Sequence, residues 1–215
     1  MTKIDCLNNG YIELLEHMGG DAAVVRAARK CWGSESKGAE SDRKLIRHLL
    51  TAGHKTPFEF MAFNFSVKAP LFIARQWFRH RHAGICEQSM RHCVAERDDW
   101  VPDDLDEHHK SEWAWYSLVA FNGYRGFVKA GMPKEQARAI LPQGMYVSWD
   151  WTVNGSSLMN FLTLRTDKHA QKEIQVYAKA ILELVEPVAP VSFGEWKEQQ
   201  KEGGHAEAKG SGSNN

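Results

Sequence analysis

The stretch FEFMAFNFSVKAPLFIARQWFRHRHAGICEQSMR, residues 58–91, carries the pattern that decides the fold. From Phe58 to Lys68 large apolar residues alternate with smaller or polar ones, and this period of two predicts a strand with one buried face. Glu59 is expected to open the strand, with its side chain on the buried face. The other residues on that face are Met61, Phe63, Phe65 and Val67.

A helix is predicted directly after this strand, over residues 70–78, because proline is favoured in the first turn of a helix. The helix places Arg75 and Arg79 four residues apart, and therefore on one face. The run Arg79-His80-Arg81 then falls at the helix end. Cations suit the C-terminus of any helix, so an isolated run of this kind is typical of ordinary surface charge.

The residues that follow the basic run change this interpretation. A loop that contains Gly84 leads within a few positions to a carboxylate, a hydroxyl and a further guanidinium. Arginine forks offer donors at fixed geometry to phosphate or carboxylate groups, so several of them on one loop favour an anionic ligand. The side chains that follow the loop are Glu87, Ser89 and Arg91.

Further strands and helices complete the expected fold. Residues 145–153 also alternate between apolar and polar side chains and predict a second half-buried strand, and residues 3–7 predict a short one. Helices are predicted over residues 21–32, 41–52, 108–131, 133–141, 154–166 and from 167 onward, with Asp21, Asn154 and Asp167 as N-caps. The sequence therefore predicts an α+β fold, a small twisted sheet packed by helices.

Composition narrows the classes of function. A chain of 215 residues that is 43% hydrophobic can bury roughly 70% of its unfolded surface, so one domain is expected over residues 1–200. The Gly, Ser and Asn content of residues 201–215 predicts a disordered tail. Lys+Arg and Asp+Glu are balanced at 27 each, which argues against a nucleic-acid partner. No apolar run approaches the ~20 residues that cross a bilayer, and the four cysteines lack zinc-ligand spacing.

Residues 79–92 resemble the signature of the flavin-dependent thymidylate synthases, which reads RHR, two residues, Ser, one residue, Asn-Glu, one residue, Ser, one residue, Arg-Tyr. The chain departs from it at three positions: Gly84 replaces the serine, Cys86 the asparagine and His92 the tyrosine. The resemblance continues through KIDCLNNGYIELLEHMG, VRAARKCW, GHKTPFEFMAFNFSVKAPLFIARQWFRHR, EQARAILP and WTVNGSSLMNFLTLRTDKHAQKEIQ. The matching signature residues are Arg79, His80, Arg81, Glu87, Ser89 and Arg91.

The resemblance implies the fold of these enzymes and a single catalytic domain that reductively methylates dUMP at C5 to give dTMP. FAD is the implied cofactor, methylenetetrahydrofolate the carbon donor and NADPH the reductant. A homotetramer with sites at subunit interfaces is implied. Its expected location is the cytoplasm, or the host cytoplasm if a virus encodes the chain. No nucleic-acid or membrane partner is expected. The alternatives are C5 methylation or hydroxymethylation of another pyrimidine nucleotide such as dCMP, and a non-catalytic flavin- or nucleotide-binding homologue.

Carried over by position, the resemblance also implies roles for individual residues. Arg165 is the implied catalytic residue, because a cation near the carbonyl-imide edge of uracil helps to make C5 nucleophilic. The residues implied for nucleotide binding are Gln76, Glu87, Gln88, Ser89, Met90, Arg91, Arg138 and Arg165. Those implied for the flavin are Cys31, His54, Thr56, Glu59, Arg79, His80, Arg81, His82, Glu87, Asn154, Asn160, Leu164 and His169. No metal is expected.

The residues by themselves leave other interpretations open. Arg138 alone is typical of a solvated helix arginine, and Arg165 fits a ligand or a salt bridge equally well. His80 and His82 resemble a metal pair, but two flanking arginines would repel a dication. Cys86 lies among cations, as activated cysteine nucleophiles do, whereas the favoured interpretation is a small apolar filler.

Overall fold

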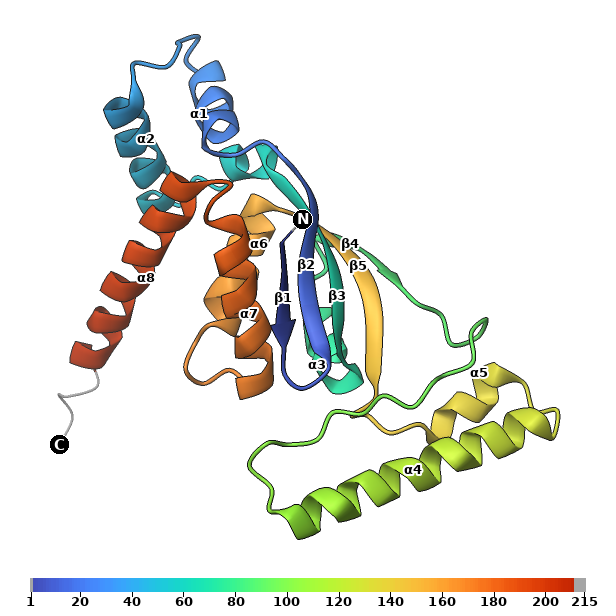
Figure 1. Cartoon of the computed structure of the whole chain (residues 1–215). Helices are drawn as coiled ribbons and strands as arrows, with labels where there is room; N and C mark the ends of the chain where they lie inside the picture. Colours follow the sequence, from blue (N-terminus) through green and yellow to red (C-terminus); the bar gives the residue numbers. More distant parts are fainter. Residues whose placement is uncertain (1, 211–215) are drawn as a thin grey trace. The chain divides into compact units, whose positions relative to one another are not determined.

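The computed structural model describes the backbone of residues 2–210 and the side chains of residues 3–201 (Figure 1). One sheet has the order β1-β2-β3-β5-β4. Its strands are β1 (Thr2–Cys6), β2 (Gly10–Met18), β3 (Ala62–Pro70), β4 (Ala83–Glu87) and β5 (Tyr146–Asn154). The helices are α1 (Asp21–Lys30), α2 (Ala39–Thr51), α3 (Leu71–Trp77), α4 (Glu107–Lys129), α5 (Lys134–Ala137), α6 (Gly155–Arg165), α7 (Lys172–Val185) and α8 (Pro190–Gly210), with 3-10 turns η1 (Thr56–Phe60) and η2 (Arg138–Ile140). The predicted α+β class is confirmed.

The chain divides into two compact units. The first comprises residues 3–13 and 65–151, and the second comprises residues 14–64 and the chain from Thr152 onward. Strands β2, β3 and β5 contribute residues to both units. The division into two units alone does not refute the single domain expected over residues 1–200, because strands of one sheet contribute to both units. The single domain therefore stays a prediction.

An aromatic cluster fixes α3 in the first unit. Trp77 of α3 meets Trp149 and Trp151 of β5 edge-on, with ring centroids 5.3 and 5.1 Å apart. Phe65 of β3 stacks on Trp151 at 5.7 Å. The alternation predicted for both strands is confirmed, since the buried side chains include Met61, Phe63, Phe65, Val67, Met145, Val147, Trp149, Trp151 and Val153. Burial of Trp77 therefore anchors the end of α3, from which the basic run Arg79-His80-Arg81 emerges.

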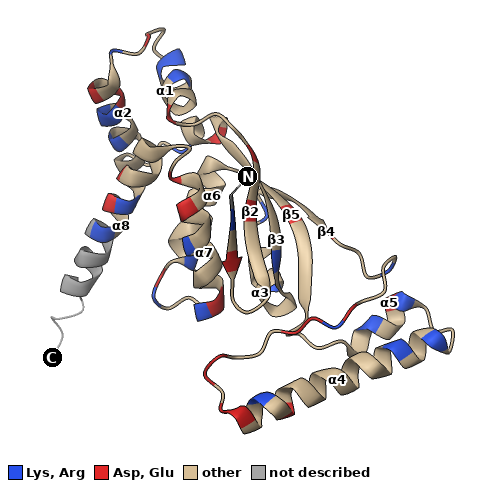
Figure 2. Cartoon of the chain, viewed as in Figure 1, with Lys and Arg blue, Asp and Glu red and all other residues tan. Residues whose placement is uncertain are grey.

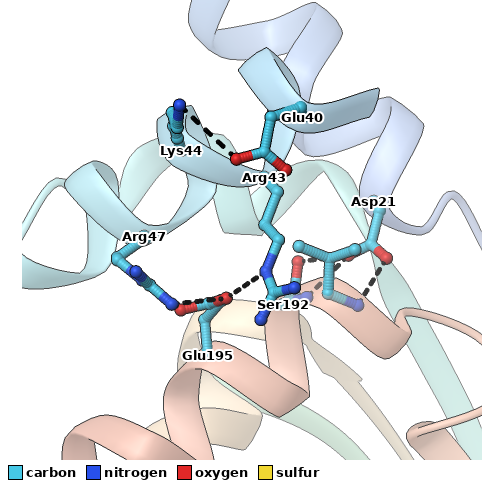
Figure 3. Close-up of polar contacts among 8 residues, drawn as sticks. Asp21, Glu40, Arg43, Lys44, Arg47, Ser192 and Glu195 are labelled. Atoms are coloured by element: carbon cyan, nitrogen blue, oxygen red, sulfur yellow. Dashed lines mark hydrogen bonds and ion pairs between the residues drawn. The ribbon is translucent and has the colours of Figure 1, made fainter. Parts of the chain in front are cut away.

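In the second unit, α8 is tied to α1 and α2 by polar contacts (Figure 3). The carboxylate of Asp21 accepts hydrogen bonds from the backbone N–H groups of Val191 and Ser192, each at 2.8 Å, and from the Ser192 hydroxyl at 2.6 Å. These backbone groups lie in the first turn of α8, where a helix has no internal acceptor for them. Asp21 is thus not the N-cap of its own helix, as predicted, but satisfies donors of α8, and Gly20 holds the N-cap position of α1.

The other predicted caps had different outcomes. Asn154 is confirmed as the N-cap of α6, since its side chain accepts a hydrogen bond from Ser157 N at 2.8 Å. Asp167 is not the cap of α7, which begins after Gln171. Asp167 instead accepts a hydrogen bond from the backbone of His169 at 2.7 Å, a local turn that competes with helix formation.

Several predicted boundaries were wrong or incomplete. The helix predicted over residues 133–141 is broken into α5 and η2, and Glu59 lies in η1 rather than opening a strand, because β3 begins at Ala62. The prediction missed β2, β4 and α8, whose sequences lack a clean period. The disordered tail over residues 201–215 stays a prediction, since α8 extends to Gly210 and residues 211–215 lie outside the described residues.

Candidate active site

The first group of expected site residues surrounds β4 in the first unit. β4 is the edge strand beside β5, and the backbone N–H of Gln88 donates to the Ser148 carbonyl at 2.9 Å, which prolongs the pairing beyond Glu87. Gly84 therefore lies in a strand and not in the predicted loop. Its neighbours carry no alternating pattern because β4 buries neither face, so backbone pairing alone determines its conformation.

A turn directly after β4 brings Ser89 and Arg91 together. The Ser89 carbonyl accepts hydrogen bonds from the backbone of His92 and Cys93, each at 3.1 Å. The Ser89 hydroxyl lies 3.4 Å from the backbone nitrogen of Arg91 and 3.5 Å from its Nε. The Lys134 ammonium donates to the His92 carbonyl at 2.8 Å, which holds this turn to the start of α5. The hydroxyl and guanidinium expected to bind a nucleotide are thus adjacent.

Three further arginines of this unit are exposed and form no close ion pair among the described residues, although the charge of Arg138 acts on the carboxyl of Glu87. Among the residues that the structure describes, no ion pair or hydrogen bond engages the side chains of Arg79, Arg81 or Arg138. In the same unit, by contrast, Arg97 is paired with Asp99 at 2.9 Å. An exposed guanidinium without a carboxylate partner can bind an added anion without breaking an existing pair.

Glu87 supplies the carboxylate of this group. Loss of water around its carboxyl raises the pKa of Glu87, and the positive charge of Arg138 opposes that rise. A carboxyl with a raised pKa takes up a proton more readily than a solvated glutamate. Glu87 can therefore act toward a ligand as an acceptor when ionised and as a donor when protonated.

The second group lies in the second unit, where α2, η1 and α6 pack. Gly53 follows α2 with a φ of +71°, a conformation that favours glycine, and the next N–H, of His54, donates to the Leu49 carbonyl at 2.8 Å. This turn, expected from the sequence, leaves His54 exposed at the start of the connection to η1. Thr56 and Glu59 of η1 are also exposed, so all three side chains can contact a ligand.

Helix α6 carries four of the expected residues. The side-chain oxygen of Asn154 caps the helix, so this residue has a structural role that does not depend on a ligand. Asn160 and Leu164 lie one turn apart and are exposed, and Arg165 ends the helix. Burial lowers the pKa of the Arg165 guanidinium. A partly desolvated cation interacts more strongly with charge on a bound ligand than a fully hydrated one does.

The remaining expected flavin residues in this unit lie at its surface. His169 Nδ1 contacts Asp167 Oδ1 at 3.0 Å, and Cys31 is the exposed C-cap residue of α1. The residues implied for the nucleotide therefore lie in the first unit, apart from Arg165, whereas eight of the thirteen implied for the flavin lie in the second. Those eight are Cys31, His54, Thr56, Glu59, Asn154, Asn160, Leu164 and His169.

A pocket of about 760 Å³ lies in the first unit. Gln88 and Met90, both implied for the nucleotide, line it together with Tyr146 and Ser148 of β5. The Tyr146 hydroxyl donates to Asn8 Oδ1 at 2.6 Å, and burial raises the pKa of Tyr146 to about 12. Tyr146 and Ser148 lie on the polar face of the predicted strand but were not among the predicted site residues.

A smaller pocket, of about 230 Å³, lies in the second unit. His54 and Asn160 line it, as expected for residues of one site, and Trp196 and Gln199 of α8 complete it. The α8 residues were missed because α8 itself was not predicted. Among the described residues no cluster of three or more His, Cys, Asp or Glu side chains is arranged to hold a metal ion. No described helix combines the length and the apolar character needed to cross a membrane.

The chain was compared with known proteins. The family model for thymidylate synthase complementing protein matches residues 13–191. The flavin-dependent thymidylate synthase of Thermotoga neapolitana is 40% identical over 200 residues, which cover 89% of this chain and 92% of that protein. The enzyme of the same name from Pseudothermotoga lettingae is 37% identical over 212 residues, which cover 93% of this chain and 96% of that protein.

The fold is similar to solved structures of the UMP/dUMP methylase PolB from Streptomyces cacaoi. The structure bound with 5-Br UMP has a TM-score of 0.80 and 29% identity, and covers 91% of this chain and 96% of its own. The structure bound with 5-Br dUMP has a TM-score of 0.81 and 28% identity, with 91% and 97% covered. The family model and the curated relatives extend over most of the chain, and this protein belongs to the thymidylate synthase complementing protein family.

Proposed function

We propose that this protein is a flavin-dependent thymidylate synthase that methylates C5 of dUMP to give dTMP. Methylenetetrahydrofolate is the carbon donor and NADPH the reductant in this proposal. The observation that carries it is the group of exposed arginines in the unit that contains Glu87 and Ser89, since Arg79, Arg81 and Arg138 form no close ion pair with a carboxylate among the described residues. An anionic nucleotide and a flavin diphosphate are ligands that such a group suits.

The nucleotide is held in this proposal by the turn after β4 and by η2. Arg91 and Ser89, already adjacent, bind the phosphate and sugar, and Arg138 supplies a second guanidinium. Glu87 contacts the nucleotide through a carboxyl whose pKa is raised. Gln76, Gln88 and Met90 complete the contacts. Each of these side chains binds or orients the substrate, so its loss weakens binding more than turnover.

The residues present also fit a flavin by the chemistry of their donors. Guanidinium groups of Arg79 and Arg81 suit a diphosphate, and the exposed His54, Asn160 and Leu164 offer polar edges and an apolar surface to a ring. When bound, the flavin carries the redox part of the reaction. Its remaining proposed contacts are Cys31, Thr56, Glu59, His80, His82, Glu87, Asn154 and His169.

Arg165 has a different proposed role. C5 of uracil becomes nucleophilic only if charge is redistributed in the ring, and a cation near the carbonyl-imide edge stabilises that charge. The lowered pKa of Arg165 reflects loss of water around its guanidinium, which strengthens such an interaction. Arg165 therefore acts on the reacting ring, whereas Arg91 and Arg138 act on the phosphate.

We infer a homotetramer with sites at subunit interfaces from the surface of α4. The middle of this helix carries no charged side chain (Figure 2). Large side chains along it are exposed, including Trp113, Trp115, Tyr116, Leu118, Val119 and Phe127. An exposed apolar surface of this kind is typical of a contact between subunits. Light scattering of the purified protein measures the assembly directly, and a monomer would contradict the inference. A cytoplasmic location belongs to the same proposal.

A second candidate substrate is the ribonucleotide UMP. It is favoured by the likeness to PolB, whose structures hold 5-Br UMP and 5-Br dUMP. The signature departures Gly84, Cys86 and His92 change hydrogen-bonding groups in and after β4, where the nucleotide is proposed to bind. dCMP is an alternative for the same reason. Its C4 amino group requires hydrogen-bond acceptors where the C4 carbonyl of uracil requires donors, so a change of hydrogen-bonding groups can alter the preferred base.

Release of tritium from C5 of the nucleotide tests these substrates. We expect FAD-dependent release from [5-³H]dUMP with methylenetetrahydrofolate and NADPH present, and much slower release from labelled UMP and dCMP. At dUMP concentrations below KM, Arg138→Ala should abolish most release, whereas the control Arg43→Ala, on α2, should retain it. Preference for UMP or dCMP would reassign the substrate. Flavin binding without release from any of the three would support a non-catalytic homologue.

A further inference from the structure

We propose that a pocket of about 450 Å³ in the first unit binds a small organic amine, in which a protonated amino group is attached to an apolar body. Side chains of α4 line this pocket together with Phe72 of α3 and the segment Asp99–Trp100. None of the lining residues has a proposed contact with the nucleotide or the flavin, so the inference is independent of the proposed function. The volume lies within the roughly 300–1,000 Å³ typical of sites for small ligands.

The walls of this pocket are aromatic and are held in place by hydrogen bonds. Trp100 makes T-shaped contacts with Phe72 and with Trp113 of α4, with ring centroids 5.0 and 5.9 Å apart. The indole N–H of Trp113 donates to the Trp100 carbonyl at 3.0 Å, and the backbone N–H of Trp100 donates to the Gly144 carbonyl at 2.9 Å. The face of an aromatic ring attracts a cation. Fixed aromatic walls therefore suit both the apolar body of an amine and its positive charge.

Two buried oxygen atoms of the lining residues have no hydrogen-bond partner among the residues that the structure describes. They are Oδ1 of Asp99 and Oγ of Ser117 on α4. The Asp99 side chain is 8% exposed and Ser117 is 4% exposed. The other carboxylate oxygen, Oδ2 of Asp99, accepts a hydrogen bond from Arg97 Nε at 2.9 Å, which leaves Oδ1 for a ligand. A buried polar atom without a partner costs free energy, and a ligand with several N–H donors satisfies both oxygens.

The charge of the lining residues selects the sign of the ligand. Within the described part of the chain, Asp99 lines the pocket with a carboxylate, and no Lys, Arg or His lines it. A phosphate or carboxylate ligand would be repelled by this carboxylate and by the negative faces of the aromatic rings. An ammonium group can instead donate to Asp99 and Ser117. The pocket therefore has a chemistry opposite to that of the exposed arginines, which suit anions.

Calorimetric titration of the full chain with 2-phenylethylammonium tests this site. The neutral probe 2-phenylethanol has the same apolar body, and we expect it to bind about tenfold more weakly. Asp99→Asn should raise the Kd for the amine about tenfold, because Arg97 holds the amide oxygen and the amide NH2 group then replaces the acceptor Oδ1. The matched control is Asp104→Asn, which changes an exposed carboxylate outside the pocket and should leave this Kd unchanged.

A second pair of variants, both on α4, separates binding from folding. Ser117→Ala should raise the Kd for the amine about threefold, and it should not lower the melting temperature of the free protein, because it removes a buried hydroxyl without a partner. The control Ser111→Ala removes an exposed hydroxyl that donates to the Glu107 carbonyl at 2.8 Å, and should leave amine binding unchanged. A lower melting temperature in Ser117→Ala together with unchanged amine binding would show that this hydroxyl is structural, and would overturn the proposal.

Other outcomes also overturn the proposal. Absence of amine binding to the parent protein would refute the site, equal affinity for the amine and the alcohol would leave only an apolar surface, and competition with dUMP or FAD would place the probe in the proposed active site. Trp113 and Tyr116 line the pocket and also belong to the α4 surface that we propose as a subunit contact. Light scattering should therefore show the same assembly with and without the amine. Dissociation by the amine would mean that a second copy of the chain fills the pocket instead.

Discussion

Two sets of arginines in this protein have opposite surroundings. In the second unit, Arg43 and Arg47 of α2 both bind Glu195 of α8, with Nε to carboxylate distances of 2.7 and 2.5 Å (Figure 3). The Glu195 side chain is 4% exposed, so the pair fastens two helices. In the first unit, Arg79, Arg81 and Arg138 are exposed, and no described carboxylate forms a close ion pair with them.

This difference separates arginines that stabilise the fold from arginines that can bind a ligand. A buried carboxylate requires a cation, because a buried charge without a partner is costly. Arg79, Arg81 and Arg138 form no close ion pair with a buried carboxylate among the described residues. The sequence alone does not distinguish the two sets, since all five arginines lie in or next to helical segments. The position of Glu195 in the fold makes the distinction.

The largest expected effect concerns Arg165. Arg165→Ala should lower kcat for dUMP by about 10²–10³, the usual cost of removing a group that stabilises charge in the transition state, and change KM little. Steady-state tritium release measures both constants. Arg47→Ala is the matched control, and it should lower the melting temperature without lowering kcat. A loss of kcat in the control equal to that in Arg165→Ala would contradict a specific role of Arg165 in turnover.

Arg91→Ala should have the next largest effect. Loss of a charge-assisted contact to phosphate costs about 1.5–3 kcal/mol, so KM for dUMP should rise by roughly 10- to 150-fold while kcat changes less. Ser89→Ala, which removes the adjacent hydroxyl, should raise KM in the same direction by a smaller factor. If Arg91→Ala lowered kcat and left KM unchanged, the phosphate would have to be assigned to other residues.

Glu195→Gln tests the structural set. We expect a loss of about 1–3 kcal/mol in the free energy of unfolding at pH 7, measured by urea denaturation, because two charge-assisted hydrogen bonds weaken. Hydrogen bonding to Arg47 first, and then to Arg43, lowers the pKa of Glu195 despite its burial. Its contribution is therefore complete above the ordinary pKa of 4.5 and is lost as the pH falls through the lower folded value.

The difference between the parent protein and Glu195→Gln should accordingly shrink in acid. The KM for dUMP should be the same in both proteins, since Glu195, Arg43 and Arg47 have no proposed contact with the nucleotide. A change in this KM comparable to that of Arg91→Ala would mean that the two sets of arginines are not separable by their carboxylate partners.

A helix or strand could be predicted from the sequence when its own residues determine it, and could not when distant partners do. β3, β5 and the α7 stripe were predictable because burial of one face imposes a period, and Met61 to Val67 or Ile174 to Val185 display it. β4 was not, since all but one of its residues are exposed and only pairing with β5 defines it. Asp21 was misassigned for a similar reason: its partners Val191 and Ser192 lie 170 and 171 residues away.

The candidate site was predictable only through the resemblance and through local spacing. Glu87, Ser89 and Arg91 lie within five residues, so their proximity follows from the sequence. The lining role of Gln199 depends on packing of α8 against α2 and could not be anticipated without the fold. The same holds for the raised pKa of Glu87, because the sequence does not show how far folding removes water from its carboxyl.

The smallest expected effect concerns Cys86, and it tests whether the site contains a nucleophile. Its thiol is exposed on β4, next to Glu87, at a position where the family signature has asparagine. If the thiol only fills space at the surface, Cys86→Ser and Cys86→Asn should change turnover of dUMP by about twofold, as ~0.5 kcal/mol surface substitutions do. Neither the parent nor the variants should form a covalent adduct with 5-fluoro-dUMP, measured by mass spectrometry.

Abolished turnover in both variants, with an adduct in the parent alone, would identify Cys86 as a nucleophile, since serine keeps the shape of the side chain but not the reactivity of a thiolate. The arginines of the first unit would then activate a thiol in addition to binding phosphate, and the role proposed for Arg165 would need revision.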